Sequence, residues 1–429
     1  MKFKTVILAL AALMTTNALA SPDSKDPYER ALWKDAVRNN LEFFDRNAWD
    51  EASGSYATDL DRQGRQTSDQ RASVALGRMV YANALAPDEL RDLPRARRAA
   101  AFILNHMTVR DGHGVRFLFS VDPQGKTKED RPFTFVFEQS YPIAGLIALY
   151  QADPESANLL PTIREAARSF WSRFHDPAQG GLFYYYNTVS GNHADDQGQE
   201  HKSYQSTVYP VSSFLLALRE ADPANRAAYD AWIRELLAVA TRHIVERDSS
   251  GKATGWLRER FSTDFAVDES YKMTEAGHIT QLAWVLDVAA DKGIFADPAQ
   301  AANARADAID LLRALVDHGG ISPIGAVYDA FDRVTGRPWV DDLGRATSAW
   351  WSTLEAVIAF ERFAERDHRL VDVSQGLKRA YFGYFFDHEF GGEVFRIDSK
   401  TGEVVDGTKG AAGKSGYHVL ETYRYLSEI

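Results

Sequence analysis

Apolar residues recur along this chain with the period of an α-helix. Six segments are apolar almost all round, which is typical of helices buried on every side. Two others, residues 227–243 and 302–316, have one polar face and would cover them. The pattern predicts an all-α chain in which buried helices alternate with half-exposed ones. The six apolar segments are residues 71–85, 143–149, 211–218, 279–288, 354–363 and 377–386.

Short segments marked by aspartate and glycine interrupt the helices six times. Each begins at a turn, continues as a short, mostly aromatic strand-like piece and turns again at glycine, as β-hairpins do. The units start roughly 60 to 75 residues apart, which is room for two helices and a hairpin. The chain is therefore predicted to repeat one plan six times. The units begin at Asp50, Asp111, Asp176, Asp248, Asp317 and Asp387.

Six helix pairs in one chain bury their apolar faces best when they close into a ring. We therefore predict an (α/α)6 barrel with short β-hairpins at one end, formed by residues 21–429 as a single domain. The alternative is an open helical solenoid, and a hairpin at the same place in each of six units favours closure. Because irregular segments on a rigid scaffold usually carry function, a pocket is expected at the hairpin end.

Residues 1–20 have the features of a signal peptide. Lys2 and Lys4 precede the apolar run from Val6 to Leu13, and Ala18-Leu19-Ala20 resembles a cleavage site. The alternative is an uncleaved N-terminal anchor. After residue 21 no apolar run has the length of a membrane span, so the mature form is expected to be periplasmic or secreted, with no membrane contact.

Composition narrows the possible chemistry. The chain has no cysteine, which excludes disulfides and thiolate mechanisms. Its net charge of −11, without a basic stripe, argues against nucleic acid as a partner. No glycine-rich phosphate loop or closely spaced histidine pair is present, so we predict no cofactor and no metal. His278, His418 and Glu355 remain residue types that zinc can use.

Polar and aromatic residues stand where the chain enters the buried helices. Aromatic faces pack on the C–H surfaces of sugars, and fixed polar groups match their hydroxyls. This combination predicts a small-molecule sugar as the partner. Taken singly, Arg71 could instead pair with a carboxylate at a rim, and a tryptophan could fill the core. The candidates are Arg71, Gln139, Lys202, Tyr209, Glu275, His278, Gln281, Trp350, Trp351, Glu355, Lys414, Tyr417 and His418.

Three motifs carry a family resemblance: Gly277-His278 with Trp284, Trp350-Trp351-Ser352-Thr353-Leu354-Glu355-Ala356, and Lys414-Ser415-Gly416-Tyr417-His418. Gln70-Arg71, Gly180-Gly181-Leu182-Phe183 and Lys202-Ser203-Tyr204 support them. Across the mature chain the sequence resembles the N-acylglucosamine 2-epimerase family, which includes cellobiose 2-epimerases and mannose isomerases. The resemblance implies an (α/α)6 barrel and metal-free proton abstraction next to a sugar carbonyl.

By this resemblance, His278 and His418 would act as general acid and base through an enediolate. Arg71 would stabilise the oxyanion, and Glu355 would orient a histidine or a sugar hydroxyl. Histidine suits such work because its pKa lies near neutrality. Epimerisation needs one group on each face of the carbon, whereas aldose–ketose isomerisation returns the proton to the neighbouring carbon. Either reaction is compatible with these residues.

Four positions depart from the family pattern. Gln281 stands where glutamate is common, so His278 lacks its usual carboxylate unless Glu275 or Glu355 replaces it. Gly413 stands where cellobiose-type enzymes have tryptophan, and Tyr209 where they have histidine. Glu421 replaces an arginine and could pair with His418. Gly413 and Tyr209 argue against a cellobiose-type disaccharide as the substrate. The expected export favours a free sugar or glycan fragment over nucleotide sugars and sugar phosphates.

Two other functions stay open. The first is an oligosaccharide hydrolase or lyase on the same barrel. It would need two carboxylates across the bond, with Glu138, Glu275 and Glu355 as the candidates. The second is a sugar-binding protein that has lost its chemistry, which the replacement at Gln281 would explain.

Overall fold

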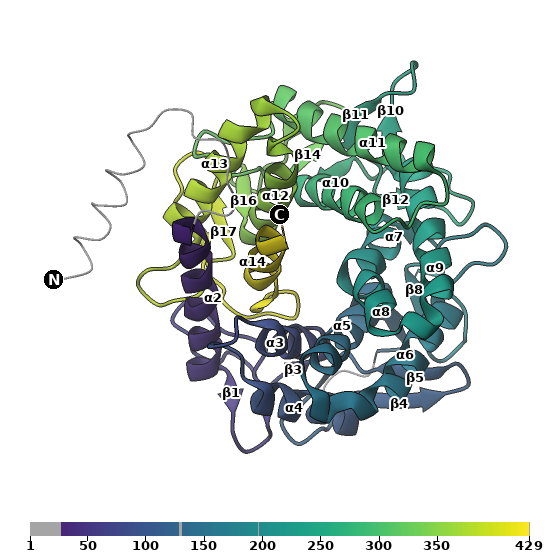
Figure 1. Cartoon of the computed structure of the whole chain (residues 1–429), viewed down its shortest axis with the longest axis vertical. Coiled ribbons are helices and arrows are strands. Elements are labelled where there is room, and N and C mark those ends of the chain that lie inside the picture. Colours follow the sequence, from purple (N-terminus) through teal and green to yellow (C-terminus); the bar gives the residue numbers. More distant parts are fainter. Residues whose placement is uncertain (1–26, 128–130, 196, 429) are drawn as a thin grey trace.

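The computed structural model describes residues 27–127, 131–195 and 197–428. Their helices form two concentric rings (Figure 1). The inner ring is the one that the all-round apolar segments predict, because its helices pack against neighbours on every side. It consists of α3 (Ser73–Leu85), α5 (Val136–Ala152), α7 (Tyr204–Pro210) continuing into α8 (Leu216–Ala221), α10 (Ala276–Asp291), α12 (Trp350–Ala364) and α14 (Tyr417–Glu428).

The outer ring is amphipathic. In α11, for example, the buried residues Ala304, Ala308, Leu311, Leu312 and Leu315 form one stripe toward the inner helices. The alternation of the two rings along the chain confirms the predicted (α/α)6 barrel. The outer helices are α2 (Pro27–Asn47), α4 (Leu93–Phe102), α6 (Leu160–Phe174), α9 (Arg226–Val239), α11 (Pro298–Asp317) and α13 (Val371–Ala380).

The outer helices α4, α9 and α13 end in a π-helical turn, and short 3-10 helices precede α6, α9 and α13. The π turns are Ile103–Met107 after α4, Ala240–Ile244 after α9 and Tyr381–Phe385 after α13, and a fourth, Val211–Leu215, joins α7 to α8. The 3-10 helices are Pro154–Leu159, Pro223–Asn225 and His368–Leu370.

The strand that enters an inner helix pairs with a strand of the following unit. These antiparallel pairs link consecutive units around the ring and hold the N-termini of the inner helices together. The pairs are β3 (Arg71–Ala72) with β6 (Ser120–Val121), β7 (Phe133–Phe135) with β8 (Tyr185–Asn187), β9 (Lys202–Ser203) with β12 (Arg260–Phe261), β13 (Met273–Glu275) with β14 (Ala330–Asp332), and β16 (Thr347–Ala349) with β17 (Arg396–Asp398).

The remaining strands form local hairpins or extend these pairs. β1 (Trp49–Asp50) pairs with β2 (Ser55–Tyr56), β4 (Thr108–Asp111) with β5 (Gly114–Phe117), and β10 (Val245–Arg247) with β11 (Ala253–Leu257). β15 (Arg337–Pro338) adds to β14, and β18 (Val404–Asp406) adds to β17.

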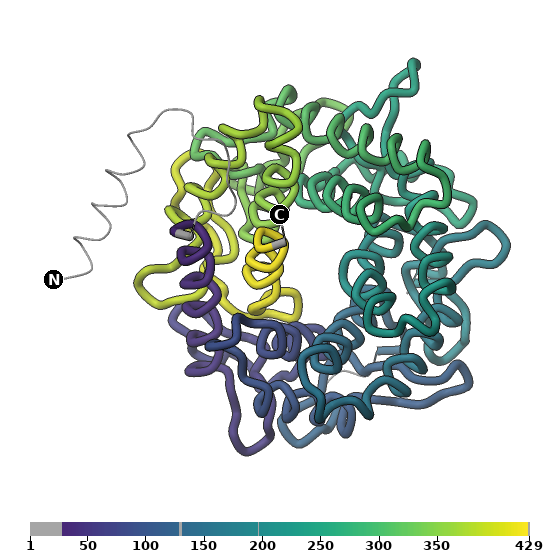
Figure 2. Tube along the Cα trace, viewed as in Figure 1, coloured from purple at the N-terminus to yellow at the C-terminus, as the bar shows by residue number. Residues whose placement is uncertain are grey.

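The first and last units join and close the ring. The backbone N–H of Leu60 donates to the carbonyl of Gly410 at 3.1 Å, and that of Lys409 donates to the carbonyl of Leu60 at 3.0 Å. The first and last inner helices also pack together, and Figure 2 shows the purple and yellow ends of the described chain side by side. The open solenoid is therefore excluded.

One predicted inner helix lies in the outer ring. Residues 377–386 span the end of α13 and its π turn, while α14 completes the inner ring. Leu377 and Ala380 of α13 are buried, but Asp372 and Arg379 are exposed, so this helix is apolar on only one side. The predicted signal peptide, residues 1–20, lies outside the described residues. Within the described part, no helix combines the length and apolarity needed to cross a bilayer.

Candidate active site

Two histidines from different inner helices contact the same indole. His278 is the third residue of α10, and His418 is the second residue of α14. Their ring centroids lie 5.5 Å and 6.2 Å from that of Trp351, the second residue of α12. Trp351 is half-buried, whereas both histidines are buried. The fold therefore brings together three helix starts that are far apart in sequence.

Gly277 makes room for this indole. A Cβ atom at position 277 would lie 2.4 Å from the six-membered ring of Trp351 and 2.9 Å from Ser352 Oγ. Both distances are shorter than any ordinary contact of a Cβ atom. A side chain at this position would displace Trp351, so the glycine before His278 is needed for packing.

His278 is held by a carboxylate and two tyrosines. Its Nδ1 lies 2.8 Å from Glu259 Oε2, and its Nε2 lies 2.8 Å from the hydroxyl of Tyr209. Its ring stacks on Tyr204 with a centroid distance of 4.0 Å. Burial alone would lower the pKa of His278, but Glu259, Glu275 and Glu355 together raise this pKa above its ordinary value.

The surroundings of His418 shift its pKa in the opposite direction. Its Nδ1 lies 3.1 Å from Glu355 Oε1 and 3.8 Å from Glu421 Oε2. Burial lowers the pKa of His418, and the Arg78 guanidinium lowers this pKa further, against the opposing effect of Glu355. The pKa values of the two histidines are therefore shifted in opposite directions, up for His278 and down for His418.

Glu355 is fixed by the α10 residues that follow His278. Trp284 Nε1 donates to Glu355 Oε2 at 2.6 Å, and Gln281 Nε2 donates to Glu355 Oε1 at 3.3 Å. The side-chain oxygen of Gln281 accepts from the Tyr204 hydroxyl at 3.2 Å. Gln281 thus connects the partners of the two histidines without bonding to either imidazole.

The carboxylate that supports His278 is Glu259, which the sequence reasoning missed. Neither Glu275 nor Glu355, the two substitutes considered for the usual glutamate, bonds to Nδ1 of His278. Glu275 instead donates its backbone N–H to Glu259 Oε1 at 2.8 Å and so fixes that carboxylate. Burial raises the pKa of the Glu275 carboxyl to about 7, and the nearby His278 opposes this rise. The charged run Arg258-Glu259-Arg260 gives no sequence signal for such a role, because it is typical of an exposed loop.

Arg78 of α3 is the second residue that the sequence reasoning missed. Its guanidinium lies 3.9 Å from the ring centroid of Tyr141 and donates to the carbonyl of Gly413. It is buried, and no carboxylate among the described residues forms an ion pair with it. An arginine inside the apolar run of α3 is the signal that could have identified it, because lone charges are rarely buried.

Arg71 lies at the first hairpin instead. Its guanidinium donates to Ser55 Oγ at 3.0 Å, to Asp50 Oδ2 at 3.2 Å and to the carbonyl of Asp69 at 3.1 Å. Among the described residues, no hydrogen bond or ion pair joins it to either histidine. The structure thus places Arg71 as a rim residue that pairs with a carboxylate, the alternative considered from the sequence.

Gln139 and Lys202 are also bound to hairpins. The side chain of Gln139 forms hydrogen bonds in both directions with the backbone of Phe117, each 2.8 Å long. Lys202 Nζ donates to Asp176 Oδ2 at 2.8 Å and to the carbonyl of Gly180 at 2.7 Å. Both side chains have their polar groups occupied by the protein.

Trp350, Lys414 and Tyr417 pack around His418. The Trp350 ring contacts His418 edge-on at 5.8 Å, and Lys414 Nζ lies 3.8 Å from the Trp350 centroid. Burial lowers the pKa of the Lys414 ammonium to about 7. Tyr417 contacts the His418 ring at 5.1 Å, and its hydroxyl donates to Glu421 Oε1 at 2.6 Å.

Each histidine belongs to a cluster in which ligand-type atoms lie within 4.8 Å of one another. The clusters are Glu259, Glu275 and His278, and Glu355, His418 and Glu421. In the first, hydrogen bonds from His278 and from the Glu275 backbone already occupy both oxygens of Glu259. We therefore interpret the first cluster as a carboxylate–histidine pair, in which the carboxylate orients the ring.

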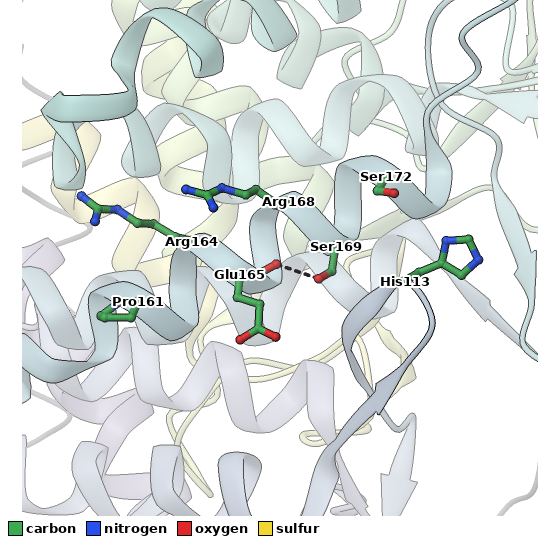
Figure 3. A pocket seen from close by; sticks show the side chains of 7 residues that line it. All are labelled: His113, Pro161, Arg164, Glu165, Arg168, Ser169 and Ser172. Carbon is green, nitrogen blue, oxygen red and sulfur yellow. Dashed lines mark hydrogen bonds between the residues drawn. The ribbon is translucent and has the colours of Figure 1, made fainter.

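Two hollows in the described structure border some of the candidate residues, and a third lies apart from them. A cleft of about 530 Å³ at the hairpin end is bordered by Glu275, Asp329, Trp339 and Arg396. A cavity of about 210 Å³ lies near the C-terminal ends of the inner helices, next to Tyr417 and Glu421. A third, of about 440 Å³, lies on outer helix α6 beside His113 (Figure 3) and contains none of the candidate residues.

Comparison with known proteins agrees with this fold. The sequence profile of the N-acylglucosamine 2-epimerase (GlcNAc 2-epimerase) family matches residues 54–422, so the chain belongs to this family, whose members include sugar epimerases and isomerases. Comparison with curated protein sequences gave no match.

Solved structures show the same architecture at low identity. The cellobiose 2-epimerase of Spirochaeta thermophila is 17% identical, with a TM-score of 0.76, 95% of this chain covered and 98% of that one. A D-mannose isomerase is 14% identical, with a TM-score of 0.78 and coverages of 96% and 100%. An α-mannanase of Bacteroides thetaiotaomicron is 12% identical, with a TM-score of 0.59 and coverages of 93% and 94%. At such identities the likeness concerns the fold alone.

Proposed function

We propose that this protein is a carbohydrate 2-epimerase or aldose–ketose isomerase that works by proton transfer through an enediolate. One observation carries the proposal: two carboxylate-supported histidines, His278 and His418, contact the half-buried indole of Trp351 from different inner helices. An indole face packs on the C–H surface of a sugar ring or chain. A sugar over Trp351 would then lie within reach of two acid–base centres.

The different environments of the two histidines suggest a division of labour. His418, whose pKa is lowered, would remove the proton next to the carbonyl in its neutral form. His278, whose pKa is raised, would supply a proton from the other side. Delivery to the same carbon gives epimerisation, and delivery to the neighbouring carbon gives isomerisation. Glu355 and Glu259 would orient the two rings.

Arg78 fits the role of stabilising the enediolate. A buried guanidinium without a carboxylate partner favours negative charge nearby. Its charge adds to the lowering of the pKa of His418 and opposes the rise that burial causes in the pKa of Tyr141, so it lies close enough to influence the site. We therefore assign to Arg78 the role that the resemblance gave to Arg71. Arg78→Met should lower kcat by about 100-fold, whereas Arg71→Met should act mainly on stability.

Deuterium exchange tests the proposal directly. We would incubate the protein with a panel of free aldoses and ketoses in heavy water and follow the C1 and C2 signals by NMR. The expected result is deuterium at the carbon next to the carbonyl of one sugar, with its epimer or ketose isomer accumulating. His278→Ala and His418→Ala should each lower the exchange rate by about 100-fold or more.

His113→Ala is the matched control, since His113 is exposed and lies at the outer hollow of Figure 3. Its rate should equal that of the wild type. Release of reducing ends from an oligosaccharide without any exchange would instead support the hydrolase alternative. Sugar binding without either reaction would support a protein that has lost its chemistry.

A further inference from the structure

Both ring nitrogens of His278 are engaged by the protein. Glu259 Oε2 lies 2.8 Å from Nδ1, and the Tyr209 hydroxyl lies 2.8 Å from Nε2. One face of the ring is covered by Tyr204, whose plane is inclined by only 16°. A group that exchanges a proton with a sugar must reach the sugar directly or through one intermediate. For His278, the atom beyond Nε2 is the Tyr209 oxygen.

The exposed fractions of the side chains around His278 agree with Tyr209 as the intermediate. Tyr209 is 8% exposed, while His278 is 1% exposed and Tyr204 is fully buried. Tyr209 also contacts Phe137, a half-buried ring, at a centroid distance of 5.8 Å. Of these three residues, Tyr209 therefore keeps the largest exposed fraction.

His418 is arranged differently. Its Nδ1 faces Glu355 and Glu421, but among the described residues no hydrogen bond engages its Nε2. This histidine retains 5% exposure. Within the described chain, Nε2 of His418 thus has no hydrogen-bond partner, whereas Nε2 of His278 is bonded to the Tyr209 hydroxyl.

We infer that Tyr209 is the catalytic acid–base group on the α10 side, and that His278 and Glu259 act through it as positioning residues. The inference rests on the proposed epimerase or isomerase function. It gives a purpose to the tyrosine that stands where cellobiose-type members have histidine. The hydrogen-bonded series Glu259–His278–Tyr209 resembles a carboxylate–histidine–hydroxyl triad in which a phenol is the reacting group.

Proton transfer along this chain balances without any other reactant. In delivery, the Tyr209 O–H bond breaks as a C–H bond forms on the enediolate carbon. The Nε2–H bond of the His278 imidazolium breaks at the same time and restores the phenol. His278 is left neutral, and His418 holds the proton taken from the substrate. Exchange with water after product release returns both histidines to their starting charges, and the reverse reaction runs the same steps backward.

The surrounding charges suit this assignment. Burial raises the pKa of the Tyr209 phenol well above its ordinary value, so the phenol stays protonated until it passes its proton to the enediolate carbon in delivery, or to neutral His278 in the reverse reaction. The raised pKa of His278 favours its imidazolium form, which is the form that donates the proton for delivery. The titratable and charged groups that face Tyr209 are His278, Glu259, Glu275, Tyr141, Tyr204 and Arg78.

Tyr209→Phe tests the inference, because it keeps the ring and removes only the hydroxyl. With the sugar that shows exchange, we expect kcat to fall by about 100-fold or more and KM to change by less than about threefold. Tyr209→His, which restores a titratable group, should recover at least about tenfold over the phenylalanine variant. Tyr204→Phe is the comparison. Among the described residues, the Tyr204 hydroxyl bonds only to the His278 carbonyl and to Gln281, so this variant should lower kcat by less than about tenfold.

A double variant shows whether Tyr209 and His278 act in one proton-transfer series or affect the rate independently. Tyr209→Phe combined with His278→Ala should be about as slow as the slower single variant, because residues that act in one chain are not additive. A Tyr209→Phe enzyme with wild-type kcat, or one in which only KM rises, would overturn the inference and leave His278 as the direct acid. Absence of exchange in the wild type would overturn the proposed function itself, together with this inference.

Discussion

Gly277 shows how a single residue without a side chain organises the candidate site. The space that a Cβ atom would fill is occupied by the indole of Trp351, which contacts both histidines. Two of the most visible features of the sequence, a Gly-His pair and a Trp-Trp pair, are therefore parts of one contact. The glycine acts through close approach, and no special backbone conformation is involved, because its φ is not positive.

We expect Gly277→Ala to displace Trp351 and to lower kcat/KM by about tenfold or more, since an added methyl group in a tight contact costs about 1–3 kcal/mol. Steady-state kinetics and tryptophan fluorescence would measure the two effects. Gly383→Ala is the control, because a Cβ atom at position 383 meets nothing within 4 Å. Full activity and unchanged fluorescence in Gly277→Ala would show that the contact with Trp351 is not needed.

Glu355 and Glu259, the carboxylates beside the two histidines, should affect different parts of the pH profile. The neutral form of His418 is present above its lowered pKa, so activity should rise through an acidic limb below about pH 6.5. The imidazolium of His278 is lost above its raised pKa, which gives an alkaline limb above about pH 6.5. Glu355→Gln removes a group that raises the pKa of His418 and should move the acidic limb to lower pH.

Glu259→Gln should instead move the alkaline limb to lower pH, because Glu259 raises the pKa of His278. The pH dependence of kcat/KM for the two variants and the wild type would measure both shifts. Glu355 also raises the pKa of His278, so the acidic limb is the one that distinguishes the two variants. An acidic limb that stays in place in Glu355→Gln, or that moves in Glu259→Gln, would contradict the assignment of one carboxylate to each histidine.

At the scale of the elements, two hairpins are fixed by the same device in different units. Lys202 Nζ bonds to Asp176 and to the carbonyl of Gly180; Lys409 Nζ bonds to Asp387 at 2.9 Å and to the carbonyl of Gly391 at 2.7 Å. Both lysines are buried. The sequence reasoning took Lys202 for a sugar-binding residue, but its repeat in the sixth unit indicates a structural role.

Lys409→Met should destabilise the protein by about 3 kcal/mol, because it leaves a buried carboxylate with one cation fewer. Denaturant unfolding at pH 7 would measure this, with the exposed Lys400→Met of the same hairpin as the control. Burial raises the pKa of Asp387, but Arg62 and Lys409 outweigh it and hold this pKa at about 2. The wild-type contribution should therefore be complete above about pH 4 and vanish as the pH falls toward 2. Equal stability of the two variants at pH 7 would show that the contact of Lys409 with Asp387 does not stabilise the hairpin.

At the scale of the whole molecule, the candidate site depends on closure of the ring. His418 lies on the last inner helix and His278 on the fourth, and the joint between Leu60 and Gly410 connects the last unit to the first. A Cβ atom at position 410 would lie 2.5 Å from the carbonyl oxygen of Thr58. The joint therefore has no room for a larger residue.

Gly410→Ala should lower the free energy of unfolding by about 1–3 kcal/mol and weaken activity, because both histidines depend on the closed ring. Denaturant unfolding and kinetics on the same sample would test this. Gly112→Ala, at an open position in the β4–β5 turn, should change neither. A Gly410→Ala protein with wild-type stability would show that the joint tolerates expansion.

The sequence by itself determined the elements, the sixfold repeat and the positions of both histidines. It could do so because helical periodicity and turn residues are local properties that survive in any tertiary arrangement. It also identified Trp351, Glu355 and Tyr209 as residues that enter the barrel. Assignment of residues 377–386 to the inner ring failed because an apolar run does not show on which side of the helix its neighbours lie.

Only the tertiary structure decided which side chains meet. Glu259 reaches His278 from a loop, and Arg78 reaches the histidine side of the barrel from the middle of α3, whereas Arg71, seven residues earlier, remains at the rim. Such contacts join residues far apart in the chain, and their distances depend on ring closure and on close approaches such as that at Gly277. The sequence placed the histidines, but the closed ring gave each of them a carboxylate and placed Tyr209 beside one.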